Sequence, residues 1–215
     1  LIDKLSTAGS KKFAIFDASV EEAKGIVSDT DQNALVTDIK VTDTSDVIDH
    51  AFDTENAASL TLLSDSKVTL INLVDPKIPM DLTFSQIAPA NTTNLAVLAK
   101  INATNFALNI DAATVANAFT LQTNTGVDGS HTYSGKVKNI SISDSNSSIQ
   151  TNFEDLKKMT KLVSIGLTGS PTGSTDPERV LTFTASKILE DSSVSLFKKI
   201  TQSPYYLDAT NTSMS

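Results

Sequence analysis

Oxygen-bearing side chains gather at the ends of two strand-like segments of the sequence. Asp43 ends the first segment and Asp46 follows it, whereas Asp144 ends the second segment and Asn146 follows it. Carboxylate and amide oxygens are the ligands that calcium prefers in proteins. The same side chains also accept hydrogen bonds from backbone N–H groups at helix N-termini, which is the simpler explanation. These four residues are therefore the candidates for a metal site, with calcium as the only cofactor considered.

A second acidic run resembles the start of a calcium-binding loop. Asp29, Asp31 and Asn33 have the spacing of the first three ligands of an EF-hand. The loop requires Gly at its sixth position and Glu at its twelfth, but Ala34 and Lys40 stand there. The sequence therefore predicts a turn at this position and not an EF-hand.

The chain lacks the usual catalytic constellations. Its two histidines, His50 and His131, have no second His nearby in the sequence, and the chain contains no Cys to serve as ligand, nucleophile or disulfide partner. It contains no Gly-x-Ser-x-Gly, P-loop or Gly-x-Gly-x-x-Gly motif. The segment His131–Tyr133 lies among glycines and is interpreted as a loop insertion. The sequence predicts that this protein is not an enzyme.

Composition narrows the possible partners and the location. The 215 residues carry a formal net charge of −8, which disfavours nucleic acid and anionic membranes because both need clustered Lys and Arg. No run approaches the roughly 20 apolar residues that span a bilayer. The chain starts at Leu1 without a signal peptide, so we interpret it as an internal fragment of a longer protein.

The sequence contains an internal repeat. Lys4, Lys100 and Lys199 each stand in a similar short motif, at spacings of 96 and 99 residues (100 − 4 and 199 − 100). Several further landmarks recur in the same order, which indicates a duplication. The matched landmarks are 36–43 with 137–144, Ile48 and Phe52 with Ile149 and Phe153, and 82–85 with 181–184.

The repeat sets the predicted domain organisation. Residues 1–12 end a preceding repeat, 13–105 form repeat 1, 106–203 form repeat 2, and 204–215 begin a following repeat. Each copy is predicted to run strand, short helix, strand, helix, hairpin, helix. The fold class is α/β or α+β, built from tandem strand-helix units. These units either stack as an α/β solenoid, which we favour, or close into separate domains.

Periodicity places the elements of the second copy. Alternation predicts a strand over 137–143, and apolar residues at helical spacing predict a helix containing Ile149, Phe153, Leu156 and Met159. Strands are predicted over 162–167 and 180–184, joined as a hairpin through a Gly- and Pro-containing loop at 169–177. The apolar stripe of Leu189, Leu196 and Ile200 predicts a second helix, and short additional helices are predicted within 17–27 and 111–121. The predicted core residues are Ile48, Phe52, Leu95, Leu98, Ile101, Ile149, Phe153, Leu156, Leu189, Leu196 and Ile200.

The run VKNISISDSNSSIQTNFEDLKKMTKLVSIGLTGS, with RVLTFTASKILEDSSVSLFKKITQSPYYLDAT after it, resembles a known class of repeat. Similar repeats occur in very long secreted proteins of Gram-negative bacteria, namely S-layer proteins and giant repeat adhesins. The first copy departs from this pattern at Leu73–Pro76, where a Gly-rich turn would be expected. The resemblance implies a structural role at the cell surface and brings no catalytic residues with it.

Two functional hypotheses follow. The first is a non-catalytic structural region of a secreted surface layer or cell-surface assembly, which self-associates with neighbouring copies or adjacent repeats. The second is an adhesin module that recognises a host protein or glycan. An adhesin module would need an exposed aromatic patch or a set of convergent polar side chains, which distinguishes it from a lattice or stalk module.

Overall fold

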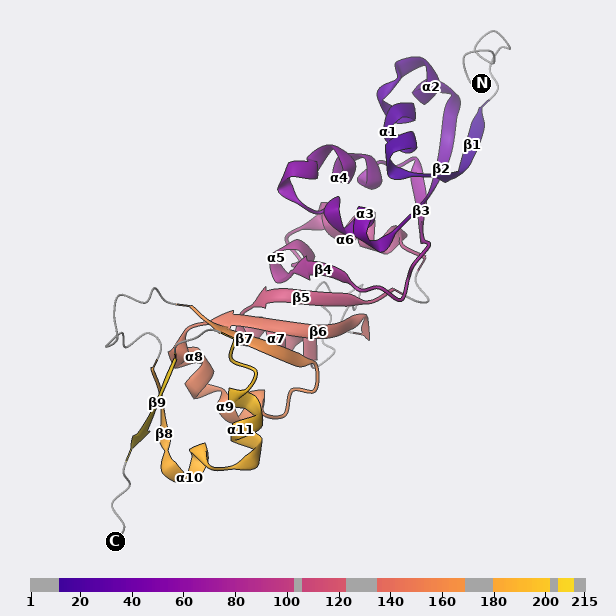
Figure 1. The fold of residues 1–215 in the computed structure, drawn as a ribbon. Helices are drawn as coiled ribbons and strands as arrows, with labels where there is room; N and C mark the ends of the chain where they lie inside the picture. Colours follow the sequence, from indigo (N-terminus) through magenta and orange to yellow (C-terminus); the bar gives the residue numbers. More distant parts are fainter. Residues whose placement is uncertain (1–11, 103–105, 123–134, 169–179, 202–204, 211–215) are drawn as a thin grey trace. The chain divides into compact units, whose positions relative to one another are not determined.

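The computed structural model describes residues 12–102, 106–122, 135–168, 180–201 and 205–210 (Figure 1). Within these ranges the chain is α/β, with strands that pair in parallel. The contacts divide it into two compact units, unit 1 (Leu1–Leu108) and unit 2 (Asn109–Ser215). Among the described helices, none has the length and apolar character required to cross a bilayer.

Unit 1 contains a parallel sheet with the strand order β1 (Phe13–Ala18), β2 (Val36–Asp43) and β3 (Val68–Leu73). The middle strand β2 buries Ile39 and Val41 completely, as expected for a strand with neighbours on both edges. An isolated parallel bridge between Ile71 and Ile101 adds one further step beside β3. The sheet therefore grows by successive strand-helix-strand connections.

Helices supply these connections. Helix α1 (Val20–Ser28) begins with a capping box, in which Ser19 and Glu22 bond each other's backbone N–H groups. The remaining elements of unit 1 are α2 (Thr30–Leu35), α3 (Ser45–His50), η2 (Thr54–Asn56), α4 (Ala57–Ser64), β4 (Met80–Thr83), α5 (Phe84–Ile87) and α6 (Thr92–Lys100). Helix α4 contacts both α1 and α6, and these helices pack against β2 and β3.

Unit 2 shows the same kind of alternation. Strand β5 (Leu108–Ala113), whose first residue ends unit 1, is followed by α7 (Val115–Gln122) and β6 (Val137–Asp144). The other elements are α8 (Asn146–Thr151), α9 (Phe153–Leu156), β7 (Leu162–Leu167), β8 (Val180–Thr184), α10 (Ala185–Ile188), α11 (Asp191–Phe197) and β9 (Tyr206–Thr210). Strands β5, β6 and β7 are successive neighbours in one sheet, and β8 pairs in parallel with β9.

An aromatic cluster forms part of the core of unit 2. The ring centroid of Phe153 lies 4.3 Å from that of Phe183 and 5.2 Å from that of Phe197, and all three side chains are buried. Tilted pairs at such distances add to the free energy gained from apolar burial. This cluster ties α9, β8 and α11 together.

The predicted core is confirmed except at one residue. All the predicted core residues are buried apart from Leu189, which is 77% exposed. The apolar spacing from Leu189 to Ile200 predicted one continuous helix, and this was wrong. Helix α10 ends at Ile188, Leu189 is its C-cap, and α11 starts only at Asp191, so the helical phase is not kept across this break.

The predicted hairpins are wrong. Strand β7 pairs with β6, whereas β8 pairs in parallel with β9; β3 and β4 also lie in different sheets. A parallel pair needs a crossover between its strands, and α10 and α11 provide it between β8 and β9. Sequence alternation gives the strands but not the direction in which they pair. The predicted loop at 169–177 lies outside the described residues.

One of the landmark matches is also wrong in register. Phe84 is the first residue of α5 and is half-buried, whereas Phe183 lies inside β8 and is buried in the aromatic cluster. The N-cap threonines Thr83 and Thr184 occupy equivalent places, immediately before α5 and α10. Leu82, fully buried at the end of β4, is therefore the counterpart of Phe183.

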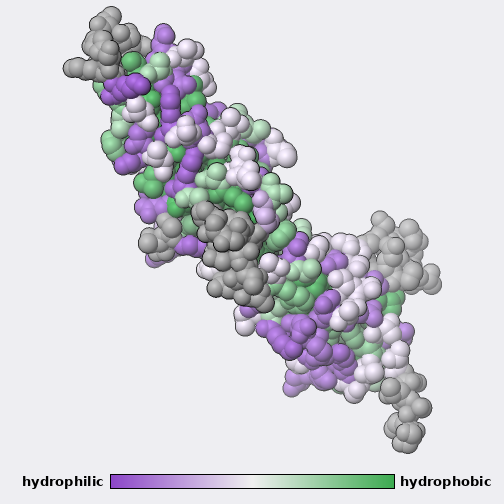
Figure 2. Space-filling view, turned by 180° about the vertical axis from the view of Figure 1, so that it is seen from behind, coloured by the Kyte–Doolittle hydropathy of each residue, from purple (hydrophilic) through white to green (hydrophobic). Residues whose placement is uncertain are grey.

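Within each unit, small hydrophobic patches alternate with hydrophilic ones on the face drawn in Figure 2. The exposed large hydrophobic side chains include Phe16, which is 60% exposed and has the Lys40 ammonium 4.6 Å from its ring centroid. Scattered apolar residues of this kind are normal on a protein surface.

Candidate functional site

The carboxylates at the ends of β2 and β6 each accept a hydrogen bond from the start of an earlier helix. Asp43 Oδ2 accepts from Val20 N at 3.0 Å, and Asp144 Oδ2 accepts from Val115 N at 2.9 Å. Val20 and Val115 are the first residues of α1 and α7, where backbone N–H groups have no partner within the helix. Each aspartate thereby joins the end of a strand to the start of a helix.

Asp144 is the more fully bonded of the two. Ser145 N donates to its Oδ1 at 2.7 Å, and Ser148 Oγ donates to its Oδ2 at 3.0 Å. Partial burial raises the pKa of Asp144, but the hydrogen bonds from Val115, Ser145 and Ser148 together outweigh this and hold the pKa below its ordinary value. The carboxylate is thus bonded in its ionised form.

The other two predicted calcium ligands lie apart from this arrangement. The carboxylate of Asp46 is exposed and stands 3.5 Å from His50 Nδ1. Asn146 donates from Nδ2 to Val180 O at 2.9 Å and accepts from Ser147 N at Oδ1. In the described part of the chain, no three His, Cys, Asp or Glu side chains gather in a geometry that could hold a metal ion. The calcium prediction at these four residues stays a prediction.

Of the two histidines, the structure describes only His50. Its Nδ1 lies 2.7 Å from Asp46 O, and this backbone contact, with the nearby carboxylates, raises the pKa of His50. The ring lies at the last residue of α3 on the surface, where a positive charge favours the helix C-terminus. His131 and its neighbours lie outside the described residues.

Lys100 and Lys199 form hydrogen bonds with backbone carbonyl groups of preceding segments of the chain. Lys100 Nζ donates to Leu63 O at 2.8 Å and to Asp65 O at 2.7 Å, and burial lowers the pKa of Lys100. Lys199 Nζ donates to Leu162 O, at the start of β7. The residue after each lysine, Ile101 or Ile200, forms an isolated parallel bridge with the neighbouring strand.

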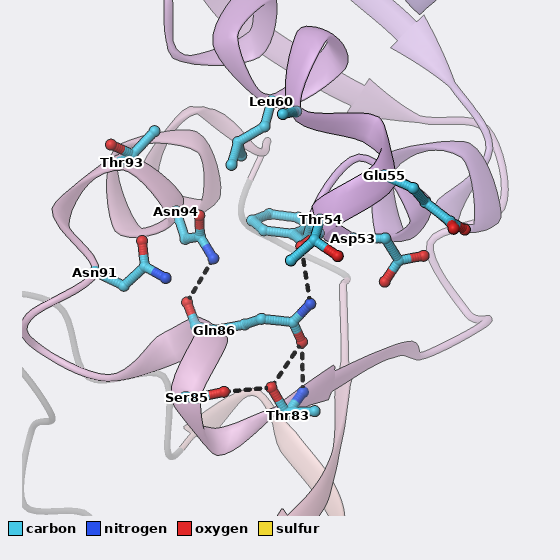
Figure 3. Close-up of a pocket in the computed structure, with 12 residues that line it drawn as sticks. Asp53, Thr54, Glu55, Leu60, Thr83, Ser85, Gln86, Asn91, Thr93 and Asn94 are labelled. Atoms are coloured by element: carbon cyan, nitrogen blue, oxygen red, sulfur yellow. Dashed lines mark hydrogen bonds between the residues drawn. The ribbon is translucent and has the colours of Figure 1, made fainter.

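Unit 1 also contains an open cavity of about 890 Å³, which the sequence did not predict (Figure 3). Most of its lining residues have polar side chains, and apolar atoms also contribute to its wall. The residues come from the turn after α3, from η2, α4 and α5, from the end of β4, and from the start of α6. The lining residues are Phe52, Asp53, Thr54, Glu55, Ala57, Leu60, Thr83, Ser85, Gln86, Asn91, Thr93 and Asn94.

Gln86 organises the floor of this cavity. Its Oε1 accepts from Thr83 N at 2.7 Å and from Thr83 Oγ1 at 3.0 Å, while its Nε2 donates to Phe52 O at 3.0 Å. The buried Asn94 donates from Nδ2 to Gln86 O at 2.9 Å (Figure 3). These bonds fix β4, α5, α6 and the turn after α3 to one another. The spacing Thr83-x-x-Gln86 is a capping-box signature that sequence inspection could have found.

The surroundings of the cavity are negative. Asp53 and Glu55 line it, and Asp49, near the end of α3, lies four residues before Asp53 in the sequence. Burial raises the pKa of Asp49 to about 6, against a hydrogen bond from Asp81 N and with a further upward contribution from the Asp81 carboxylate. Among the described residues that line the cavity, none is Lys, Arg or His. The cavity therefore disfavours anionic groups.

Comparison with protein families, curated proteins and solved structures finds no match to this chain. The functional argument therefore rests on the geometry of the chain itself.

Proposed function

We propose that this chain is a non-catalytic structural repeat region of a secreted surface layer or cell-surface assembly. The observation that carries the proposal is the shared joint formed by Asp43 with Val20 and by Asp144 with Val115. In both units, a carboxylate at the end of a central strand accepts a hydrogen bond from the N–H of the first residue of an earlier helix, α1 in unit 1 and α7 in unit 2. These two aspartates form hydrogen bonds with main-chain N–H groups, and such bonds stabilise the fold rather than form a reaction centre.

Further correspondences support a duplicated module. Strands β2 and β6 have eight residues each and the same sequence of buried, half-buried and exposed positions. Outside glycine, the described residues with positive φ are Asp17 (58°) and Ala112 (52°), each the last but one residue of its strand. A left-handed backbone is costly for such residues, so its occurrence at matching places indicates the same local design.

These correspondences favour two copies, residues 13–105 and 106–203, within a stacked α/β solenoid. In such an architecture each strand-helix turn buries its apolar face against the next turn, and the chain extends by adding turns. The partners of the chain are then adjacent repeats or neighbouring copies. Calcium, if it acts in this assembly, is assigned to the ends of β2 and β6.

Imaging of the full-length protein on its native cells, with and without a calcium chelator, tests this proposal. An ordered surface lattice that is shed on chelation is the expected result. Surface-exposed protein that forms no lattice and binds a host protein or glycan would favour the adhesin alternative. A protein confined to the cytoplasm would overturn both the location and the function.

The adhesin alternative has one observation in its favour. The cavity of unit 1 brings amide, hydroxyl and carboxylate side chains together from separate elements, as a binding module requires. The experiment that separates the two roles is the self-assembly of the purified full-length protein, which a lattice protein shows and a monomeric adhesin does not.

A further inference from the structure

The cavity of unit 1 is lined in part by polar side chains that form no hydrogen bond or ion pair with the described part of the chain. In the described part of the chain, Asp53, Glu55 and Asn91 make no side-chain hydrogen bond or ion pair. In Figure 3, Asp53 and Glu55 lie on one side, Asn91 and Asn94 on the opposite side, and Gln86 between them. The rigid floor made by Gln86 thus separates two sets of polar groups.

The corresponding side chains of unit 2 are bonded to one another. Lys187 occupies the third helical position after the cap Thr184, as Gln86 does after Thr83. Its ammonium lies 2.8 Å from a carboxylate oxygen of Glu154, the residue that follows Phe153 as Asp53 follows Phe52.

Lys157 completes this network in unit 2, with Nζ 3.0 Å from Glu154 and 2.7 Å from Glu190. The inserted helix α4, which contributes Ala57 and Leu60 to the cavity, has no counterpart between α9 and β7. Unit 1 therefore differs from unit 2 in its polar side chains and in one wall.

The chemistry of the lining selects a class of ligand. The described lining has two carboxylates and no cationic side chain, which disfavours phosphates, sulfates and carboxylates as ligands. Carboxylate oxygens accept hydrogen bonds from hydroxyl groups, and an asparagine amide both donates and accepts. Leu60 and Ala57 supply apolar surface for C–H groups. The volume of about 890 Å³ lies within the range of small-molecule sites, roughly 300–1,000 Å³.

We propose that this cavity binds a neutral polyhydroxylated ligand, a short oligosaccharide without acidic groups. Asp53, Glu55 and Asn91 bond its hydroxyl groups, and Leu60 contacts its carbon skeleton. The inference develops the binding alternative named above and leaves the structural proposal for the rest of the chain intact. An open cavity of this kind gives weak binding, because the hydroxyl groups of the ligand exchange hydrogen bonds with water for hydrogen bonds with protein at little net gain.

The test begins with a glycan microarray that displays neutral and acidic oligosaccharides, probed with the labelled chain. The strongest neutral oligosaccharide is then titrated into the ¹⁵N-labelled protein and followed by NMR. We expect the side-chain amide signals of Asn91, Asn94 and Gln86 to shift during the titration. An array that binds only acidic glycans, or that binds none, would overturn the proposal.

Three variants locate the site. Asp53→Asn and Gln86→Lys should each weaken binding of that oligosaccharide at least tenfold; the second introduces the residue that unit 2 carries at this position. Glu154→Gln, the matched change in unit 2, should leave binding unchanged. Thermal unfolding checks that each variant is folded, and the amide shifts of the wild-type protein localise the ligand independently of any variant. Equal affinity in all three variants, or shifts confined to unit 2, would refute the site without bearing on the imaging test of the structural role.

Discussion

Replacement of Asp144 by alanine tests the joint between strand and helix most directly. The change removes the acceptor for Val115 N, Ser145 N and Ser148 Oγ at once. Val115 is buried, so its N–H loses a partner that water cannot replace, at a cost of about 2 kcal/mol. The other two donors are partly accessible and cost about 0.5–1 kcal/mol each. The free energy of unfolding should fall by about 3–4 kcal/mol.

Urea unfolding followed by circular dichroism measures this loss, and hydrogen exchange at the Val115 amide shows where it arises. Asp111→Ala, an exposed aspartate in the same unit, is the control and should change stability by less than about 0.5 kcal/mol. A loss below about 1 kcal/mol, with unchanged protection at Val115, would refute the reasoning. The hydrogen-bond account predicts the same loss with calcium chloride as with chelator, whereas a calcium ligand predicts a larger loss with calcium.

The pH dependence of the Asp144 effect has a definite sign. Because the folded protein lowers the pKa of this carboxyl below its ordinary value of 3.8, the ionised form stabilises the fold. This contribution is complete above pH 3.8 and is lost as the pH falls through the lower pKa of the folded state. The difference between wild type and Asp144→Ala should therefore shrink in acid.

Three further predictions concern stability. Phe153→Ala should lower the free energy of unfolding in urea by about 3–5 kcal/mol, because the buried ring packs at the centre of an aromatic cluster. The control Phe16→Ala, at an exposed ring, should lower it by less than about 1 kcal/mol. Similar losses in the two variants would show that the cluster is not packed as described. Lys199→Met, which keeps the apolar stem but not the bond to a carbonyl, should lower stability by about 1–2 kcal/mol, and an unchanged midpoint would contradict that bond. Asp49→Asn should stabilise the protein at pH 7 by about 1 kcal/mol and flatten its stability between pH 4 and 6. A pKa raised from 3.8 to about 6 corresponds to about 3 kcal/mol, which solvent screening reduces at a half-buried carboxylate. Asp31→Asn, an exposed control, should do neither.

Sequence periodicity predicted the elements better than it predicted their connections. The alternation in residues 137–143 identified β6, and the spacing of Ile149, Phe153 and Leu156 identified a buried face. Even there the predicted helix is two short helices, α8 and α9, separated at Asn152. Apolar spacing reports which side chains turn inward, and several short helices can satisfy it as well as one long helix.

The pairing of strands and the cavity were beyond the reach of the sequence pattern. The hairpin prediction failed because alternation is the same in parallel and antiparallel strands, so partner and direction depend on contacts distant in sequence. The cavity was missed because its lining joins residues 52–60, 83–86 and 91–94, which show no shared motif. The paired aspartates were found, but as candidate calcium ligands, because their backbone partners lie 23 and 29 residues earlier in the chain.

The comparison between the two units assigns different roles to different residues. Both units contain an aspartate at the end of the central strand (Asp43 or Asp144) and a lysine (Lys100 or Lys199), and these side chains form hydrogen bonds with main-chain groups. Such bonds can stabilise any strand-helix unit. The side chains around the cavity differ between the units: unit 2 pairs its charges internally, and unit 1 leaves Asp53 and Glu55 without an ion-pair partner among the described residues. The carboxylates of Asp53 and Glu55 therefore add no ion-pair energy to the stability of unit 1. A function specific to one unit should therefore be sought at the cavity, and one common to both at the joints.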